Sequence, residues 1–167
     1  MDAGIVLYKL AKEFGLSRGT TEERLRLQKT IYLLQASGFR IGYGFSWYRY
    51  GPYSQELVYD SYRALYAERD KWAEETNDVN FSEETQKKLG RFKKVLGPKL
   101  SDTKQLELLA SADFVRRTWL SEGAGEDEVV AEFKRHKTRS YDGQPITDAE
   151  IKAAKTTLDQ LKQDLSD

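Results

Sequence analysis

The stretch WYRYGPYSQEL, from Trp47 to Leu57, decides which fold the chain can adopt. Within Gly42 to Tyr50, aromatic residues recur at every second position, which is typical of a β-strand. Gly51-Pro52 then ends that strand, because proline has no N–H to donate to a ladder and glycine favours a turn. Ser54 can cap a helix that we expect to continue to about Glu68. The stretch therefore predicts a strand, a turn and a helix in direct succession.

The alternation divides the aromatic side chains into two sets. We expect Phe45 and Trp47 to pack on helices, and Tyr48 and Tyr50 to lie on the opposite face. The segment 39–41 is either an antiparallel partner or part of the same irregular strand. Tyrosine offers a rigid ring with a hydroxyl group and is enriched in interface hot spots. The second set of rings therefore contacts a partner protein, stacks on nucleic-acid bases, or simply belongs to the core.

Helical signals surround this strand on both sides. An apolar stripe that begins at Ala3 ends at Gly15, and the capping box Thr20/Glu23 begins a helix that reaches about Ser37. After a polar linker at 77–80, further helices are expected to begin near Ser82, Asp102, Glu128 and Thr147. The sequence predicts a single compact domain over residues 1–167, with its motif core at 21–66. The fold class is mainly α with a small antiparallel β element (α+β), namely six or seven helices and one short hairpin or strand pair.

Length and composition narrow the function classes. The chain has 167 residues, which is enough for one domain with a hydrophobic core. Charged residues make up 32% of it, which is polar for a globular domain but is not the composition of a disordered chain. Lysine plus arginine number 27, as do aspartate plus glutamate, so a strongly basic nucleic-acid protein is excluded while a local basic patch is not. The absence of cysteine excludes disulfides, thiolate metal sites and a cysteine nucleophile. With no membrane-length apolar run and no signal-peptide pattern, we expect a cytoplasmic protein.

Signals for catalysis are weak. His136 is the only histidine, it has no second ligand at metal-site spacing, and we expect it to be a solvated surface residue. No nucleotide-binding glycine motif or nucleophile elbow occurs. A pair of catalytic carboxylates that meets only in the folded chain stays open as an alternative. The sequence favours a protein that is not an enzyme and that has no cofactor and no metal.

DNA binding is the alternative function. The segment Leu10 to Thr20 is similar to the first half of a helix-turn-helix, but Thr21 and Arg24 fall where the second half needs apolar residues. A hairpin beside helices would also suit a winged-helix regulator. The candidate nucleic-acid contacts are Arg18, Arg24, Arg26, Lys134, Arg135, Lys137 and Arg139. The basic run 134–139 equally suits a solvated helix face that balances the acidic loop before it.

Two segments carry a resemblance to a known family. RLQKTIYLLQASG, from Arg26 to Gly38, followed by YGFSWYRYGPYSQEL resembles the YwgA-like family of small prokaryotic proteins, which is related to the Panacea, or SocA-like antitoxin, domain. The matching residues are Leu27, Lys29, Ile31, Tyr32, Gly51, Pro52, Glu56 and Leu57. The resemblance implies a mostly helical, non-enzymatic domain that neutralises or regulates a partner protein, often in toxin–antitoxin or phage-defence settings.

The leading hypothesis is therefore a domain that binds another protein, with a toxin or a defence effector as the expected partner. Its predicted contact residues are Tyr48, Arg49, Tyr50 and Tyr53, with Lys29 nearby. Nucleic acid is the second class of partner, through the basic residues named above. No membrane contact is expected.

Overall fold

Two central helices organise the chain, whose computed structural model describes residues 2–166. The described residues form eight α-helices and one two-stranded antiparallel sheet, which confirms the predicted fold class with a slightly higher helix count. The α-helices are α1 (Ala3–Phe14), α2 (Thr21–Ala36), α3 (Gln55–Tyr62), α4 (Arg69–Glu75), α5 (Glu83–Leu96), α6 (Thr103–Trp119), α7 (Glu126–His136) and α8 (Asp148–Leu165). The strands are β1 (Ser46–Tyr48) and β2 (Gly51–Tyr53), and a π-helical turn (Arg63–Ala67) and a 3₁₀ turn (Gly97–Ser101) complete the regular structure.

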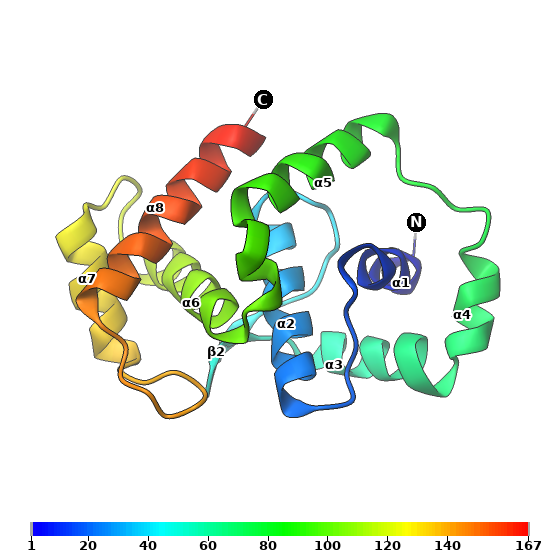
Figure 1. Cartoon of the computed structure of the whole chain (residues 1–167), viewed down its shortest axis with the longest axis horizontal. Helices are drawn as coiled ribbons and strands as arrows, with labels where there is room; N and C mark the ends of the chain where they lie inside the picture. Colours follow the sequence, from blue (N-terminus) through cyan, green and yellow to red (C-terminus); the bar gives the residue numbers. More distant parts are fainter. Residues whose placement is uncertain (1, 167) are drawn as a thin grey trace.

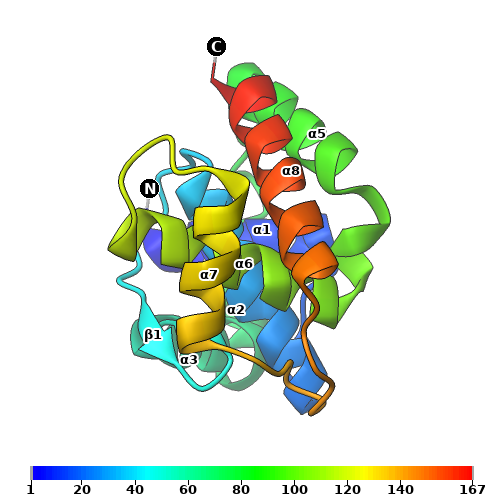
Figure 2. The same ribbon diagram turned by 90° about the vertical axis from the view of Figure 1, so that its left-hand side faces the viewer.

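Helices α2 and α6 pack against each other at the centre of the molecule (Figure 1). Helices α7 and α8 pack on α6, and α5 packs on α8, so these four elements form one half of the fold (Figure 2). Helices α1, α3 and α4 form the other half beside α2 (Figure 1). Every residue of α2 from Leu27 to Leu34 is buried. This central helix is therefore enclosed on all sides.

The predicted helix boundaries follow from the capping residues. The hydroxyls of Thr20, Ser54 and Thr147 each accept a hydrogen bond from a backbone N–H in the first turn of the helix that follows. Gly15 ends α1 with φ of 61°, a left-handed conformation that glycine adopts without a steric penalty. Helix α5 ends at Leu96, just before Gly97-Pro98. The sequence predicted these helix boundaries because capping depends on residues only a few positions apart.

The hairpin differs from the prediction in its pairing. Strand β1 pairs with β2, with Trp47 opposite Pro52. The segment 39–41 is neither the partner of β1 nor part of it, so both alternatives for this segment are wrong. Gly51 has φ of 98°, which lets the chain reverse after Arg49 and Tyr50. Tyr48 and Gly51 form the pair that closes this two-residue hairpin. The next pair, Trp47 and Pro52, lies at a position of the antiparallel ladder that exchanges no hydrogen bonds, so proline is tolerated there.

The segment 42–45 was expected to belong to the strand but lies outside it. Its backbone is held instead by one side chain of α2. Gln35 accepts hydrogen bonds from the N–H groups of Gly42 and Tyr43, and its amide donates to the carbonyl oxygen of Tyr43. Because the amide of Gln35 satisfies these groups, the segment needs no partner strand.

Helix α4 was not among the helices expected from the sequence. Its Trp72 is buried against α1, where a Cβ atom added at Gly4 would lie 2.4 Å from the Trp72 ring. One tryptophan on a short polar helix thus fixes α4 to α1. None of the helices in residues 2–166 combines the length and the apolar composition that crossing a membrane requires.

Candidate functional site

The hairpin presents an aromatic surface to solvent. Tyr48 is 60% exposed, and its ring lies against that of Tyr53 with centroids 5.2 Å apart. The strand register places these two residues diagonally on one face of the hairpin. Arg49 is exposed at the tip. We call Tyr48, Arg49 and Tyr53 the hairpin surface; all three were expected to contact a partner.

The opposite face of the hairpin packs on α6 and α7. Trp47 lies 5.8 Å from Phe114 and 5.7 Å from Trp119, measured between ring centroids. The His136 ring stacks on Trp119 at 3.8 Å with an interplanar angle of 11°, and its Nε2 lies 3.1 Å from Glu132. The expectation that His136 is a solvated surface residue is therefore wrong, because two side chains fix its ring.

Two neighbouring side chains of α2 anchor the hairpin from below. The Gln28 amide binds Ser54 twice, donating to its carbonyl oxygen and accepting from its N–H, each at 2.9 Å. The Lys29 ammonium donates to the carbonyl oxygen of Pro52 at 2.7 Å. Lys29 is only 1% exposed. The prediction that Lys29 contacts a partner is therefore wrong, since the enclosed position of α2 leaves its side chain no route to the surface.

Lys29 belongs to a group of three buried charges, Lys29, Glu107 and Lys137, which we call the buried charge cluster. Glu107 is fully buried on α6, and its Oε2 lies 2.7 Å from the Lys137 Nζ. Its Oε1 accepts a hydrogen bond from the Tyr141 N–H. Burial, reinforced by the Lys137 charge, lowers the pKa of Lys29 to about 7, although the Glu107 carboxylate opposes this shift.

The cluster also reaches the hairpin tip. The Lys137 ammonium lies 5.8 Å from the centre of the half-buried Tyr50 ring, a cation–π geometry. Tyr50 was expected in the contact surface, but its ring instead covers the cluster. Lys137 was expected to contact nucleic acid; at 7% exposure and paired with Glu107 it cannot reach a phosphate, so that assignment is wrong.

The other predicted nucleic-acid contacts do not form one basic face. Arg26 donates to the carbonyl oxygens of Leu100 and Phe14, so its guanidinium tethers α2 to neighbouring segments. Lys134 pairs with Asp148, Arg135 pairs with Glu132, and Arg139 donates to the carbonyl oxygen of Gly143. A recognition helix must expose a face to enter the major groove, whereas α2 is buried throughout its centre. The centre of α2 thus offers no recognition face, and the interpretation of Leu10 to Thr20 as half of a helix-turn-helix stays a prediction.

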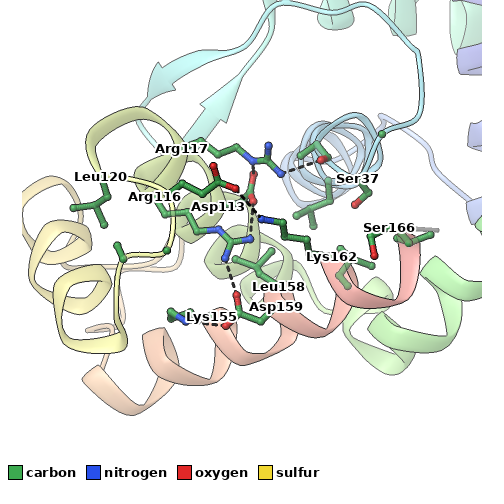
Figure 3. Close-up of a pocket in the computed structure, with 18 of the residues that line it drawn as sticks. Ser37, Asp113, Arg116, Arg117, Leu120, Lys155, Leu158, Asp159, Lys162 and Ser166 are labelled. Carbon is green, nitrogen blue, oxygen red and sulfur yellow. Dashed lines mark hydrogen bonds and ion pairs between the residues drawn. The ribbon is translucent and has the colours of Figure 1, made fainter.

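A cavity of about 910 Å³ lies between the end of α2, α6 and α8 (Figure 3). Each of its cations is paired with a carboxylate, and the buried Asp113 accepts hydrogen bonds from Arg117 at 2.7 Å and from the Tyr32 hydroxyl at 2.7 Å. Arg116 binds Asp159 at 2.8 Å. Burial and the Asp113 charge raise the pKa of Tyr32 above its ordinary range. This satisfied network joins three helices, and we assign it a structural role.

Comparisons of the chain with family models, with curated proteins and with solved structures give no match. Within residues 2–166, no three potential metal ligands come close enough together to hold an ion. The functional interpretation therefore rests on the hairpin surface and on the cluster beneath it. Sequence reasoning missed Glu107 in this cluster, although a carboxylate flanked by Leu106, Leu108 and Leu109 on a buried helix is an identifiable signal.

Proposed function

We propose that this chain is a non-enzymatic interaction domain that binds a partner protein through the hairpin surface. The observation that carries the proposal is the contact between the tilted rings of Tyr48 and Tyr53, because Tyr48 is 60% exposed while its neighbours on the hairpin are anchored. An exposed tyrosine in contact with a half-buried tyrosine and next to an arginine has the composition of an interface hot spot. Trp119, 39% exposed on α6, extends the aromatic area next to the hairpin through Trp47.

Rigidity supports the same proposal. A loop that must become ordered on binding loses affinity, whereas a surface that is already ordered does not. The backbone below the hairpin surface is fixed by Lys29 at Pro52 and by Gln28 at Ser54. A partner would therefore meet Tyr48 and Tyr53 in a single preset arrangement.

The resemblance to YwgA-like and Panacea proteins suggests the biological setting. An antitoxin-like neutraliser or a phage-defence component acts by covering a surface of its partner, and a rigid aromatic hairpin suits that task. Arg49 at the tip favours a partner that presents a carboxylate beside an apolar pocket.

Site-specific photocrosslinking in the native host tests the proposal. A benzoylphenylalanine placed at position 48 should yield one dominant covalent adduct with a host protein, which mass spectrometry then identifies. The same residue at position 87, an exposed site on α5, serves as the matched control. Adducts of equal pattern and yield at both positions, or none at 48, would contradict the proposal.

Binding measurements with the identified partner give the second test. Tyr48→Ala should raise the Kd by about 30-fold or more, the effect typical of a hot-spot tyrosine. Lys87→Ala should leave the Kd unchanged. An unchanged Kd for Tyr48→Ala would place the interface elsewhere on the molecule.

A further inference from the structure

A second cavity, of about 660 Å³, lies on the other half of the molecule. It is formed by the end of α1, the connection 15–20, the first turn of α2 and the end of α3 with its π-helical turn. In Figure 1 this connection runs from α1 past α3 to the start of α2. The cavity shares no residue with the hairpin surface, so its role is independent of the function proposed above.

Four cationic side chains and one carboxylate line this cavity. The cations are Lys12, Arg18, Arg24 and Arg69, and the carboxylate is that of Glu23. Within residues 2–166, none of the four cations has an acidic partner within ion-pair distance. The larger cavity of Figure 3 is the opposite case, because its arginines are neutralised by Asp113 and Asp159. The smaller cavity therefore keeps an uncompensated positive charge.

The contacts that these cations do make leave their charge in place. Arg24 donates to the main-chain carbonyls of Arg18 and Gly19, which are neutral acceptors. The carboxylate of Glu23 is bound by the Ser17 hydroxyl and the Gly19 N–H. It thus secures the connection between α1 and α2.

Aromatic rings stand next to these cations. Tyr62 and Tyr66 are 45% and 70% exposed, and their ring centroids are 5.5 Å apart. The Arg18 guanidinium lies 5.1 Å from the centre of the Tyr62 ring. Cations that track phosphates, combined with exposed rings on which bases stack, are the two components of a site for unpaired nucleotides.

We propose that this cavity binds a nucleoside phosphate, with the phosphates on Arg18, Arg24 and Arg69 and the base stacked on Tyr66. Its volume falls within the range of ligand sites, about 300–1,000 Å³. A free nucleotide and the end of a single strand offer the same chemistry. A duplex does not, because its bases are paired and cannot stack on a tyrosine.

Calorimetric titration with separate probes distinguishes these sources. ADP should bind with a Kd below about 1 mM. It should bind more tightly than adenosine, which lacks the phosphates, and than inorganic phosphate, which lacks the base. An octathymidylate that binds at least ten-fold more tightly than ADP identifies a single strand as the ligand, and equal or weaker binding identifies the free nucleotide. No binding of ADP or octathymidylate overturns the proposal, as does binding of a polyglutamate peptide alone.

Two variants locate the binding. Arg69→Gln should raise the Kd for ADP about ten-fold, since a charged hydrogen bond to phosphate is lost. Tyr66→Ala should raise this Kd several-fold, because the base can no longer stack on the tyrosine ring. Both residues are exposed, so the fold should tolerate the changes. Arg40→Gln removes an exposed arginine after α2, outside the cavity, and should leave ADP binding unchanged. Equal binding by all three variants and the original chain overturns the proposal.

Discussion

Lys29→Met should remove most of the dependence of stability on pH between pH 7 and 9. The Lys29 side chain is buried, and its pKa falls from an ordinary value of 10.5 to about 7, chiefly because burial disfavours the charged form. Its ammonium faces Glu107 of α6 and Lys137 after α7, and it donates to the carbonyl oxygen of Pro52. Methionine has a similar length and flexibility, so the change mainly removes the titrating group.

The direction follows from the protons that each state binds. Between pH 7 and 10.5 the unfolded chain holds a proton on Lys29 that the folded chain has released, so the free energy of unfolding rises with pH. Below pH 7 both states are protonated and the contribution is constant. The full shift corresponds to about 5 kcal/mol. From pH 7 to 9 the original chain should therefore gain about 2 kcal/mol through this residue.

Urea unfolding followed by tryptophan fluorescence at pH 7, 8 and 9 measures the effect. A gain of about 2 kcal/mol moves the midpoint by about 1 M urea. In Lys29→Met this movement should disappear, although the variant also loses the hydrogen bond to Pro52 at every pH. Lys94→Met, which removes an exposed lysine of α5, should retain the movement. Equal pH dependence in Lys29→Met and the original chain would refute the reasoning.

Three further changes test the hairpin and its surroundings in the same unfolding assay, and Gly90→Ala on α5 serves as a control for the first of them. Gly51→Ala should lower the free energy of unfolding by more than about 2 kcal/mol, because φ is 98° and the new Cβ would lie 2.4 Å from the Ser111 hydroxyl. Gly90→Ala, on a helix face with open space, should raise the free energy of unfolding by up to about 1 kcal/mol. Glu107→Gln should lose about 3–5 kcal/mol, since it leaves buried lysines without their carboxylate. Tyr48→Ala should stay within about 0.5 kcal/mol of the original chain, and a larger loss would show that this tyrosine supports the fold.

The sequence predicted what depends on neighbours along the chain. Thr20, Ser54 and Thr147 cap helices that begin one residue later, because a cap needs only a hydroxyl and the next few N–H groups. The period-two alternation also placed Tyr48 on the face opposite Trp47, because a strand sends successive side chains to opposite faces, but it left the exposure of Tyr48 open.

Contacts between distant segments could not be predicted in this way. Lys29 was expected near the contact residues of the hairpin, and only its partners from α6 and the segment after α7 explain why it is buried. The pairing of β1 with β2 was missed because Pro52 argues against a strand in general. In this hairpin Pro52 lies opposite Trp47, where the short ladder tolerates the absence of an N–H.

The position of the buried charge cluster beneath the hairpin has a physical rationale. Well-packed apolar side chains often stabilise a core as much as buried ion pairs do, so three buried charges are not explained by stability alone. Apolar contacts, however, are not directional, whereas the Lys29 ammonium must point at the Pro52 carbonyl and Lys137 must lie beneath Tyr50. These contacts fix both the backbone and the tip of a hairpin whose ladder is only three residues long on each strand. The cluster thus accounts for how so short a hairpin presents Tyr48 and Tyr53 in one arrangement.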